Sequence, residues 1–317
     1  MNGVRRFPRP ALPWWRRRTP RRARAVLVAL LLTSLPAACT TDPDRDVAPA
    51  PGQPEPGQQA VAGPAGALAA YVDRVKRAYA ARTVVARKWG LTRTPLVAPP
   101  PPAPGNKPKI TFRKGFEAGD ATLPPVFTTV PTKERIVFLT IDDGAEKDPE
   151  LLRMMDELDI PYSAFLSDYL VRENYGYFEK MQRTGVALHN HTLNHPYLPA
   201  LSYAEQKREI CGQQDVIEKR YGKRPPLFRP PYGNYNADTL RAARSCGVKA
   251  VPLWSAEAFP DRMEWREWDR DLHPGDIILT HFRGRDDWKG TMPDMIRHVM
   301  NVVTSKGYAV ARLEDYV

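Results

Sequence analysis

The sequence predicts an α/β domain over residues 110–317, built on a mainly parallel sheet that closes as a barrel or partial barrel. Seven short apolar runs follow Ile110, and most are separated by amphipathic stretches that begin with Pro, Ser or Asp and often end with Gly. Strands that alternate with helices form βα units. Seven strands in 208 residues suit a barrel better than a small three-layer sheet.

Each expected element is a distinct stretch of sequence. The expected strands are RIVFLTID (135–142), YSAFL (162–166), VALHN (186–190), PLFRP (226–230), KAVPLW (249–254), DIILTH (276–281) and YAVARL (308–313). Helices are expected over 148–159, 202–222, 236–247 and 291–307. In such folds, polar residues at the carboxyl ends of the strands are where a site is sought.

Residues 1–38 have the features of a secretion leader. They contain nine arginines and no acidic residue, and an eleven-residue apolar run, Ala25 to Leu35, leads to small residues at Ala37, Ala38 and Cys39. A bilayer span needs about 20 apolar residues, so a permanent transmembrane helix is the weaker interpretation. Paired arginines also allow a twin-arginine route, and the export route stays open.

Cys39 follows LPAA, which resembles the lipobox of bacterial lipoproteins, although Leu35 stands four residues before the cysteine instead of three. We expect lipidation at Cys39, which would anchor the protein at the outer face of the cytoplasmic membrane. The alternative is simple cleavage and release to the cell wall.

The net charge does not indicate nucleic-acid binding. The chain carries +11, and removal of the leader's nine arginines leaves +2 for residues 39–317. Two cysteines remain after Cys39, namely Cys211 and Cys246. In an exported chain they are either a disulfide pair or two buried thiols.

Three segments separate the leader from the α/β domain. Residues 39–66 are rich in Pro, Ala, Gly and Gln and are expected to form a disordered tether. Residues 67–91 predict a stalk helix, in which Leu68, Val72, Val75 and Tyr79 recur at helical spacing. Its basic residues would also suit an anionic membrane surface. Residues 92–109 form a proline-rich linker that favours extended polyproline II.

Two strand ends carry groups that suit a metal site. The first strand ends in TIDDG, so Asp142 and Asp143 leave it in different directions, one toward a metal and the other toward substrate. The third strand leads into HNHTLNH, where His191 and His195 share a face if the loop turns helically. Two imidazoles and a carboxylate suit zinc, and also non-haem iron.

Two further strand ends complete the set. RPPYG, residues 229–233, combines a rigid proline turn with backbone amides, which makes it a candidate oxyanion hole or an ordinary Pro-Gly connection. DIILTH ends at His281, which is either catalytic or packed. All of these residues fall at the same end of successive strands, so together they indicate one site.

With these motifs the chain resembles the polysaccharide deacetylase family, the NodB homology domain of carbohydrate esterase family 4. TIDDG, HTLNH, RPPYG and IILTH stand in the family's order from about residue 130 to the carboxyl terminus. The resemblance implies a distorted (β/α)7-type barrel that uses one divalent metal, most commonly Zn²⁺. It leaves out the leader, the tether and the stalk helix.

The resemblance also implies roles for the motif residues. Asp143, His191 and His195 match the family's metal ligands, and Asp142 matches its catalytic base. His281 matches the general acid that protonates the leaving amine.

Other matches surround the reacting group. Arg229 corresponds to the arginine that holds the base, and the backbone amide of Tyr232 to the donor for the tetrahedral oxyanion. Leu279 corresponds to the apolar wall for the acetyl methyl. Pro230 and Trp254 are expected to contact substrate.

The chain departs from the family at two places. Where the family has a Trp/Asp segment, this chain reads LWSAEAFPDRMEW, so Glu257 or Asp261 is the candidate to orient His281. His189 stands where the family has a small residue, and we expect it at the rim of the pocket. Trp265, Trp268 and Trp288, like Trp254, are either sugar-stacking surfaces or core.

These observations predict an exported, metal-dependent hydrolase that removes N-acetyl groups from an amino-sugar polymer. Peptidoglycan is preferred because a tethered domain can sweep the adjacent wall, whereas chitin-like and poly-N-acetylglucosamine polymers fit the local chemistry equally well. The alternatives are a weakly active carbohydrate-binding surface lipoprotein and an O-acetyl esterase. The sequence does not indicate an oligomeric state.

Overall fold

The computed structural model describes residues 64–317, which belong to one compact unit, Val61–Val317. The expected leader, the lipidation site at Cys39 and most of the expected tether lie outside the described residues. All the buried core residues fall between Ala86 and Tyr316. The unit therefore contains a complete hydrophobic core of its own.

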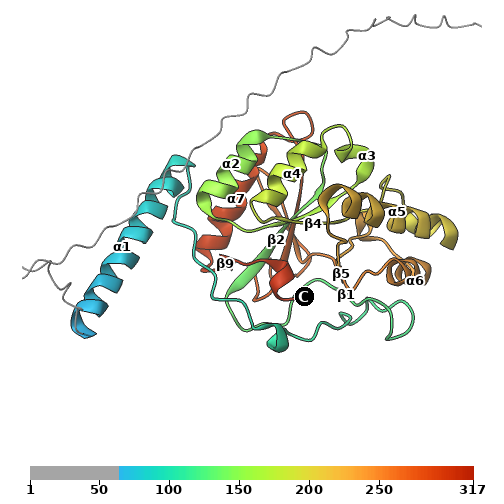
Figure 1. The fold of residues 1–317 in the computed structure, drawn as a ribbon, viewed down its shortest axis with the longest axis horizontal. Coiled ribbons are helices and arrows are strands. Elements are labelled where there is room, and N and C mark those ends of the chain that lie inside the picture. Colours follow the sequence, from blue (N-terminus) through green and yellow to red (C-terminus); the bar gives the residue numbers. More distant parts are fainter. Residues whose placement is uncertain (1–63) are drawn as a thin grey trace, which may run out of the picture. The chain divides into compact units, whose positions relative to one another are not determined.

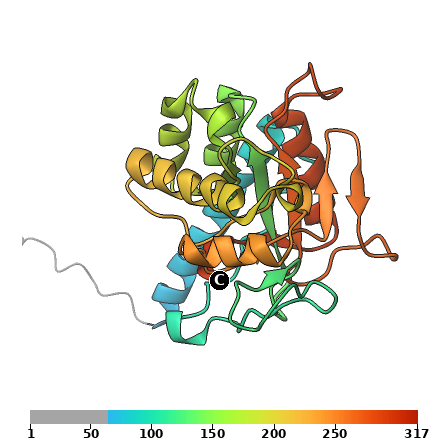
Figure 2. The same ribbon diagram turned by 90° about the vertical axis from the view of Figure 1, so that its right-hand side faces the viewer.

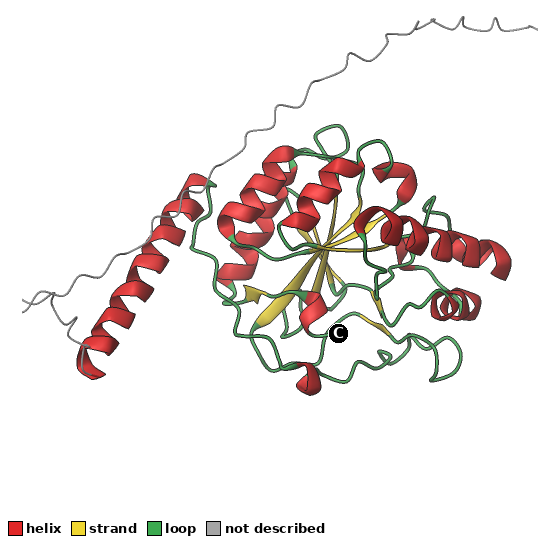
Figure 3. Cartoon of the chain, viewed as in Figure 1, coloured by secondary structure: helices red, strands yellow, loops and turns green. Residues whose placement is uncertain are grey.

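A mainly parallel sheet occupies the centre of this unit, where its strands converge in Figure 3. The strand order is β4-β3-β2-β8-β6-β7, and β9 also pairs with β2. The strands are β1 (Val126–Phe127), β2 (Ile136–Asp143), β3 (Ser163–Leu166), β4 (Ala187–Asn190), β5 (Val251–Pro252), β6 (Ala256–Ala258), β7 (Met263–Trp265), β8 (Ile277–His281) and β9 (Ala309–Val310).

The central strand β2 explains why the sheet is parallel and fully covered. Every residue of β2 is buried, and its run IVFLTI is continuously apolar but for one threonine, as in strands that have packing on both faces. It pairs in parallel with β3 on one side and β8 on the other. The register sets Asp142 opposite both Phe165 and His281, so the carboxyl ends of these strands meet at one edge.

The barrel closes through irregular backbone pairing. Residues 227 and 228 make isolated parallel bridges to Ala250 and Asn190, and β1 pairs with β5. The amide of Ile277 donates to the carbonyl of Thr128, which links this arc back to β8. The expected strand over 226–230 is therefore wrong as a regular strand, because its prolines have no N–H to donate to a ladder.

Helices surround the sheet (Figures 1 and 3). They are α2 (Pro149–Leu158), α3 (Asp168–Val171), α4 (Tyr175–Arg183), α5 (Tyr203–Tyr221), α6 (Ala237–Ser245) and α7 (Met292–Ser305). Capping residues define their starts: Ser202 and Glu205 form a capping box at α5, and Thr291 and Asp294 form one at α7. Gly222 ends α5 with φ of 76°.

Two connections add to this framework. The strands β6 and β7 form an antiparallel hairpin, seen as the orange arrows at the right of Figure 2, which the sequence had not indicated. A disulfide joins Cys211 in α5 to Cys246 at the end of α6. Single 3-10 turns cover Pro104–Asn106, Leu198–Ala200, Pro231–Gly233 and Leu313–Asp315.

The segment before the barrel begins with helix α1, Pro64–Lys88. Its start lies inside the range expected to be tether, because Pro64 can occupy a first helical turn, where no N–H is needed. None of the described helices is both long enough and apolar enough to cross a bilayer.

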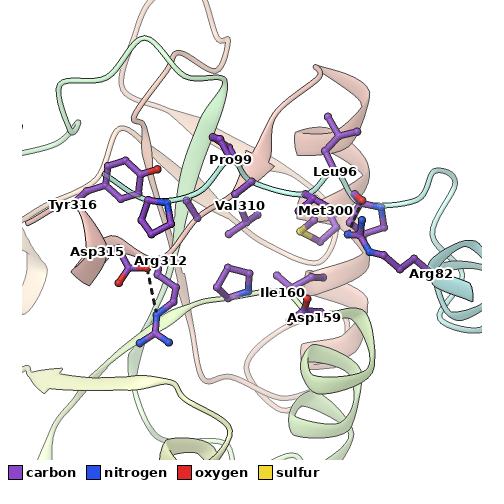
Figure 4. Close-up of a pocket in the computed structure, with 16 residues that line it drawn as sticks. Arg82, Leu96, Pro99, Asp159, Ile160, Met300, Val310, Arg312, Asp315 and Tyr316 are labelled. Atoms are coloured by element: carbon purple, nitrogen blue, oxygen red, sulfur yellow. Dashed lines mark hydrogen bonds and ion pairs between the residues drawn. The ribbon is translucent and has the colours of Figure 1, made fainter. Parts of the chain in front are cut away.

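Residues 92–109 lie against the barrel domain. The amide of Thr92 donates to the Asn301 side chain, and Leu96 forms a parallel bridge to Ala309. This segment and residues of the domain line a cavity of about 250 Å³, whose lining includes Leu96, Pro99, Val310 and Met300 (Figure 4). The linker is thus a docked part of the unit.

Candidate active site

A cavity of about 340 Å³ lies at the carboxyl edge of β2, β4 and β8. It is lined by the expected metal, base and acid residues and by the expected substrate contacts, namely Asp142, Asp143, His191, His195, Pro230, Tyr232, Trp254, Glu257, Leu279 and His281. Arg283 and Gly233 complete the lining. The structure therefore brings together side chains from five separate stretches of sequence.

Asp143, His191 and His195 converge on one point. The Nε2 atoms of His191 and His195 lie 3.5 and 3.4 Å from Oδ1 of Asp143, and the three possible ligand atoms all lie within 4.8 Å of one another. Ligands about 2.0–2.2 Å from a tetrahedral cation stand about 3.4 Å apart. Oδ1 of Asp143 is buried without a hydrogen-bond partner. These residues fit a divalent metal in spacing, in chemistry and in that unpaired oxygen.

The loop after β4 reaches this geometry without a helical turn, so the expected helical face is wrong. Thr192 and His195 have φ of 73° and 55°, values that few non-glycine residues adopt. Two side chains hold the loop: the Asn190 amide oxygen accepts from the Thr192 amide at 2.8 Å, and the Thr192 hydroxyl accepts from the His195 amide at 3.0 Å. Local backbone geometry therefore presents both imidazoles.

His191 is oriented from behind. Its Nδ1 lies 2.7 Å from the backbone carbonyl of Arg229, so Nδ1 carries the proton and Nε2 presents its lone pair to the metal position. Burial alone would lower the pKa of His191, but the carboxylates of Asp142 and Asp143 raise it above its ordinary value.

The other two ligands have the opposite pKa direction. Burial favours the neutral form of Asp143, yet the neighbouring His191 holds its pKa below the ordinary range. For His195, burial and the neighbouring His191 charge lower the pKa to about 4. At neutral pH Asp143 is therefore an anion and His195 a neutral imidazole, the forms that bind a metal.

Asp142 is held by a fully buried arginine. Nη1 of Arg229 lies 2.7 Å from Oδ1 of Asp142 and 2.9 Å from the Thr140 hydroxyl, and its Nε donates to the carbonyl of Pro252 at 2.8 Å. Burial lowers the pKa of Arg229, and the Asp142 charge opposes that shift. With Oδ1 engaged, Oδ2 is the oxygen of Asp142 that can accept another proton.

His281 has Glu257 as its partner. Nδ1 of His281 lies 3.3 Å from Oε1 of Glu257, whose strand β6 pairs with β8. Burial, with the charges of Glu264 and Asp142, raises the pKa of Glu257 to about 7, and burial lowers the pKa of His281. The alternative orienting residue, Asp261, is wrong, because it pairs with Arg262 at the surface.

The RPPYG turn presents Tyr232 at the mouth of the cavity. Tyr232 has φ of 61°, its side chain is exposed, and its ring lies 4.7 Å from that of His195. The next two amides, of Gly233 and Asn234, are bonded to the carbonyls of Pro230 and Pro231. The Tyr232 amide therefore stays the candidate donor in this turn.

Arg283 is a site residue that the sequence did not reveal. Its Nη2 lies 2.7 Å from Oδ2 of Asp143, the oxygen opposite the unpaired Oδ1. It comes two residues after His281, and no motif marks it. Only the close approach of the β8 carboxyl end to β2 brings them together.

The structure corrects the expected place of His189. Its ring is buried, and Nε2 lies 2.7 Å from Oε1 of Glu314, so it does not lie at the pocket rim. Of the four tryptophans considered for sugar stacking, only Trp254 lines this cavity. Trp265 and Trp288 pack against the core, and Trp268 is 92% exposed.

Comparison with known proteins identifies the family. The family model described as polysaccharide deacetylase matches residues 129–251. An uncharacterised protein of Streptomyces coelicolor is 38% identical over 196 residues, which cover 62% of this chain and 78% of that protein. The chain belongs to the polysaccharide deacetylase family. This confirms the resemblance stated from the motifs.

The chain is also similar to a protein named as a deacetylase and to a solved pseudoenzyme. A peptidoglycan-N-acetylglucosamine deacetylase of Bacillus cereus is 29% identical over 171 residues, covering 50% of this chain and 77% of that enzyme. A solved carbohydrate esterase family 4 pseudoenzyme of Bacillus anthracis superposes with a TM-score of 0.52 at 21% identity, covering 61% and 69% of the two chains. The predicted fold class is confirmed, and membership of the family supports a hydrolytic deacetylase that uses a divalent metal.

Proposed function

We propose that this protein removes N-acetyl groups from an amino-sugar polymer outside the cytoplasm, with one divalent cation, Zn²⁺, held by Asp143, His191 and His195. The observation that carries the proposal is the shared cavity: the three ligand atoms surround one point, and Asp142 and His281 line the same space. A binding protein would need neither a base nor an acid beside that point.

The residues divide the chemistry among them. When bound, the cation would polarise the acetamide carbonyl and lower the pKa of the attacking water. Asp142 takes a proton from that water through Oδ2, because Arg229 occupies Oδ1. The Tyr232 amide faces the oxyanion that forms at the carbonyl.

His281 completes the reaction. Its imidazolium donates a proton to the leaving nitrogen as the carbon–nitrogen bond breaks, which gives acetate and a free amino sugar. Leu279 is buried and lines the cavity, so it can pack on the acetyl methyl. Glu257 orients the imidazole and, when ionised, stabilises its charged form.

We further propose peptidoglycan as the polymer and the outer face of the cytoplasmic membrane or the cell wall as the location. The leader and Cys39 support export and anchoring, and the Bacillus cereus relative is named for peptidoglycan. An O-acetyl ester would fit the same groups. A weakly active carbohydrate-binding role is the second candidate, because a pseudoenzyme shares the fold and Glu257 replaces the usual aspartate.

The test is acetate release by residues 61–317 from peptidoglycan fragments, chitin oligosaccharides and O-acetylated glycans. We expect release that a chelator abolishes and Zn²⁺ restores, and that Asp142→Asn and His281→Ala each lower by at least about a hundredfold. Asp215→Asn and His273→Ala, at exposed ion pairs, are the matched controls. Glycan binding without release from any substrate would instead support the binding protein.

A further inference from the structure

The first part of α1 carries an apolar stripe that no other described residue covers. Leu68, Tyr71, Val72, Val75 and Tyr79 are 64%, 56%, 39%, 48% and 60% exposed. Their spacing places them on one side of the helix, since a helix turns by about 100° per residue. Large apolar side chains that are aligned in this way indicate a surface that a membrane or another protein covers.

In the last turns of α1, this side of the helix packs against the barrel domain. Ala86 lies 18 residues, or about five turns, after Leu68, and it is buried against the domain at 2% exposure. The same end is held by polar contacts, with Trp89 Nε1 donating to Glu157 at 2.7 Å and Arg82 Nη2 to the carbonyl of Pro95 at 2.9 Å. The stripe is therefore the continuation of a face that the barrel domain covers only at its end.

Charge identifies the occupant of the exposed part. Arg74 and Lys76 lie about 100° to either side of the stripe and Arg77 lies opposite it, whereas Asp73 is the one acidic residue of this helix. Long basic side chains beside an apolar face can extend toward anionic headgroups while their stems stay in apolar surroundings. Two copies of this helix that met through the stripe would instead bring their flanking cations together.

We propose that residues 66–80 of α1 bind in the interface of a membrane that contains anionic lipid, with Leu68, Val72 and Val75 in the acyl boundary. Tyr71 and Tyr79 suit the headgroup level, because their rings are apolar and their hydroxyls polar. The contact does not depend on the proposed deacetylation, nor on a lipid at Cys39. It would hold the barrel domain close to the bilayer through a second, reversible attachment.

The experiment measures how residues 61–317 partition onto vesicles, since this unit has its own core and lacks both Cys39 and the leader. Vesicles of phosphatidylglycerol and phosphatidylcholine are compared with vesicles of phosphatidylcholine alone. We expect binding to the anionic vesicles to be at least about tenfold tighter and to weaken with added salt. The triple variant Leu68→Gln, Val72→Gln, Val75→Gln should lose at least about tenfold in partitioning.

The matched control places three glutamines on the opposite side of the same helix, as Ala70→Gln, Ala81→Gln and Val84→Gln. It should bind as the parent does, and all three proteins should unfold at the same temperature, because these positions are exposed. Equal binding by both triple variants, or equal binding to both kinds of vesicle, would overturn the proposal. So would a dimer in sedimentation equilibrium that the Leu68, Val72 and Val75 substitutions abolish.

Discussion

His189 and His191 leave the same strand of the sheet two residues apart, yet they end in opposite environments. His189 is buried and lies 2.7 Å from Glu314, whose side chain is 17% exposed. His191 faces Asp143 and Asp142 across 3.5 and 3.7 Å, at the open cavity. The ring of Phe165 separates the two levels, 5.0 Å from the ring of His189 and 4.3 Å from the guanidinium carbon of Arg229.

The distances between the polar atoms distinguish the His189–Glu314 ion pair from the cluster of Asp143, His191 and His195. His189 and Glu314 are joined at hydrogen-bond distance through Nε2 and Oε1, although Nδ1 of His189 and Oε2 of Glu314 have no partner. The His189 contact lowers the pKa of Glu314 against the effect of burial. At the cavity, Nε2 of His191 and Nε2 of His195 are slightly too far from Oδ1 of Asp143 to form hydrogen bonds with it. Oδ1 of Asp143 therefore has no hydrogen-bond partner. Spacing of about 3.4 Å among several buried ligand atoms indicates room for a cation.

The largest expected effect comes from substituting each of the two histidines, His191 and His189, by glutamine. His191→Gln should lower acetate release by more than about a hundredfold, because loss of an outer-shell partner of a metal alone costs about 10- to 100-fold. His189→Gln should leave activity within about threefold but lower the free energy of unfolding by about 2 kcal/mol, since the largely buried Glu314 would lose its imidazole partner. Activity and urea unfolding of both variants test this contrast. Equal losses of activity would contradict it.

The partner of the acid gives the next effect. Glu257→Gln should lower kcat by about tenfold, because the imidazolium of His281 loses a stabilising charge. The folded-state pKa of Glu257 is raised to about 7. The protonated Glu257 therefore stabilises the folded state. This contribution to the free energy of unfolding is complete below the pKa of the unfolded state and is lost as pH rises through 7.

The same substitution therefore has opposite effects on stability and on catalysis. Without metal at pH 8, the free energy of unfolding of Glu257→Gln should exceed that of the parent by about 2 kcal/mol. At pH 4 the two proteins should have the same free energy of unfolding. Unfolding at both pH values and the pH profile of kcat measure the two effects. Asp261→Asn is the control, since Asp261 pairs with Arg262 at the surface. A larger loss of kcat in that control would restore Asp261 as the orienting residue.

The smallest expected effect concerns Arg283, which bonds the second oxygen of Asp143. Arg283→Met should weaken metal affinity by about tenfold, because Asp143 would no longer be fixed with Oδ1 toward the metal position. With saturating metal, kcat should stay within about threefold. Chelator competition measures the affinity, and an unchanged value would show that the contact only balances charge.

The sequence by itself determined the α/β class and most strand positions, because apolar runs follow from local periodicity. The metal ligands named from the motifs stay a prediction. It also determined that Asp142, Asp143, His191, His195 and His281 belong to one edge, since parallel strands bring their carboxyl ends together. Only the tertiary structure decided that Glu257 and not Asp261 meets His281, that His189 is buried with Glu314, and that Arg283 reaches Asp143. These contacts join residues far apart in the chain, and their partners depend on register and depth within the barrel, which no local pattern encodes.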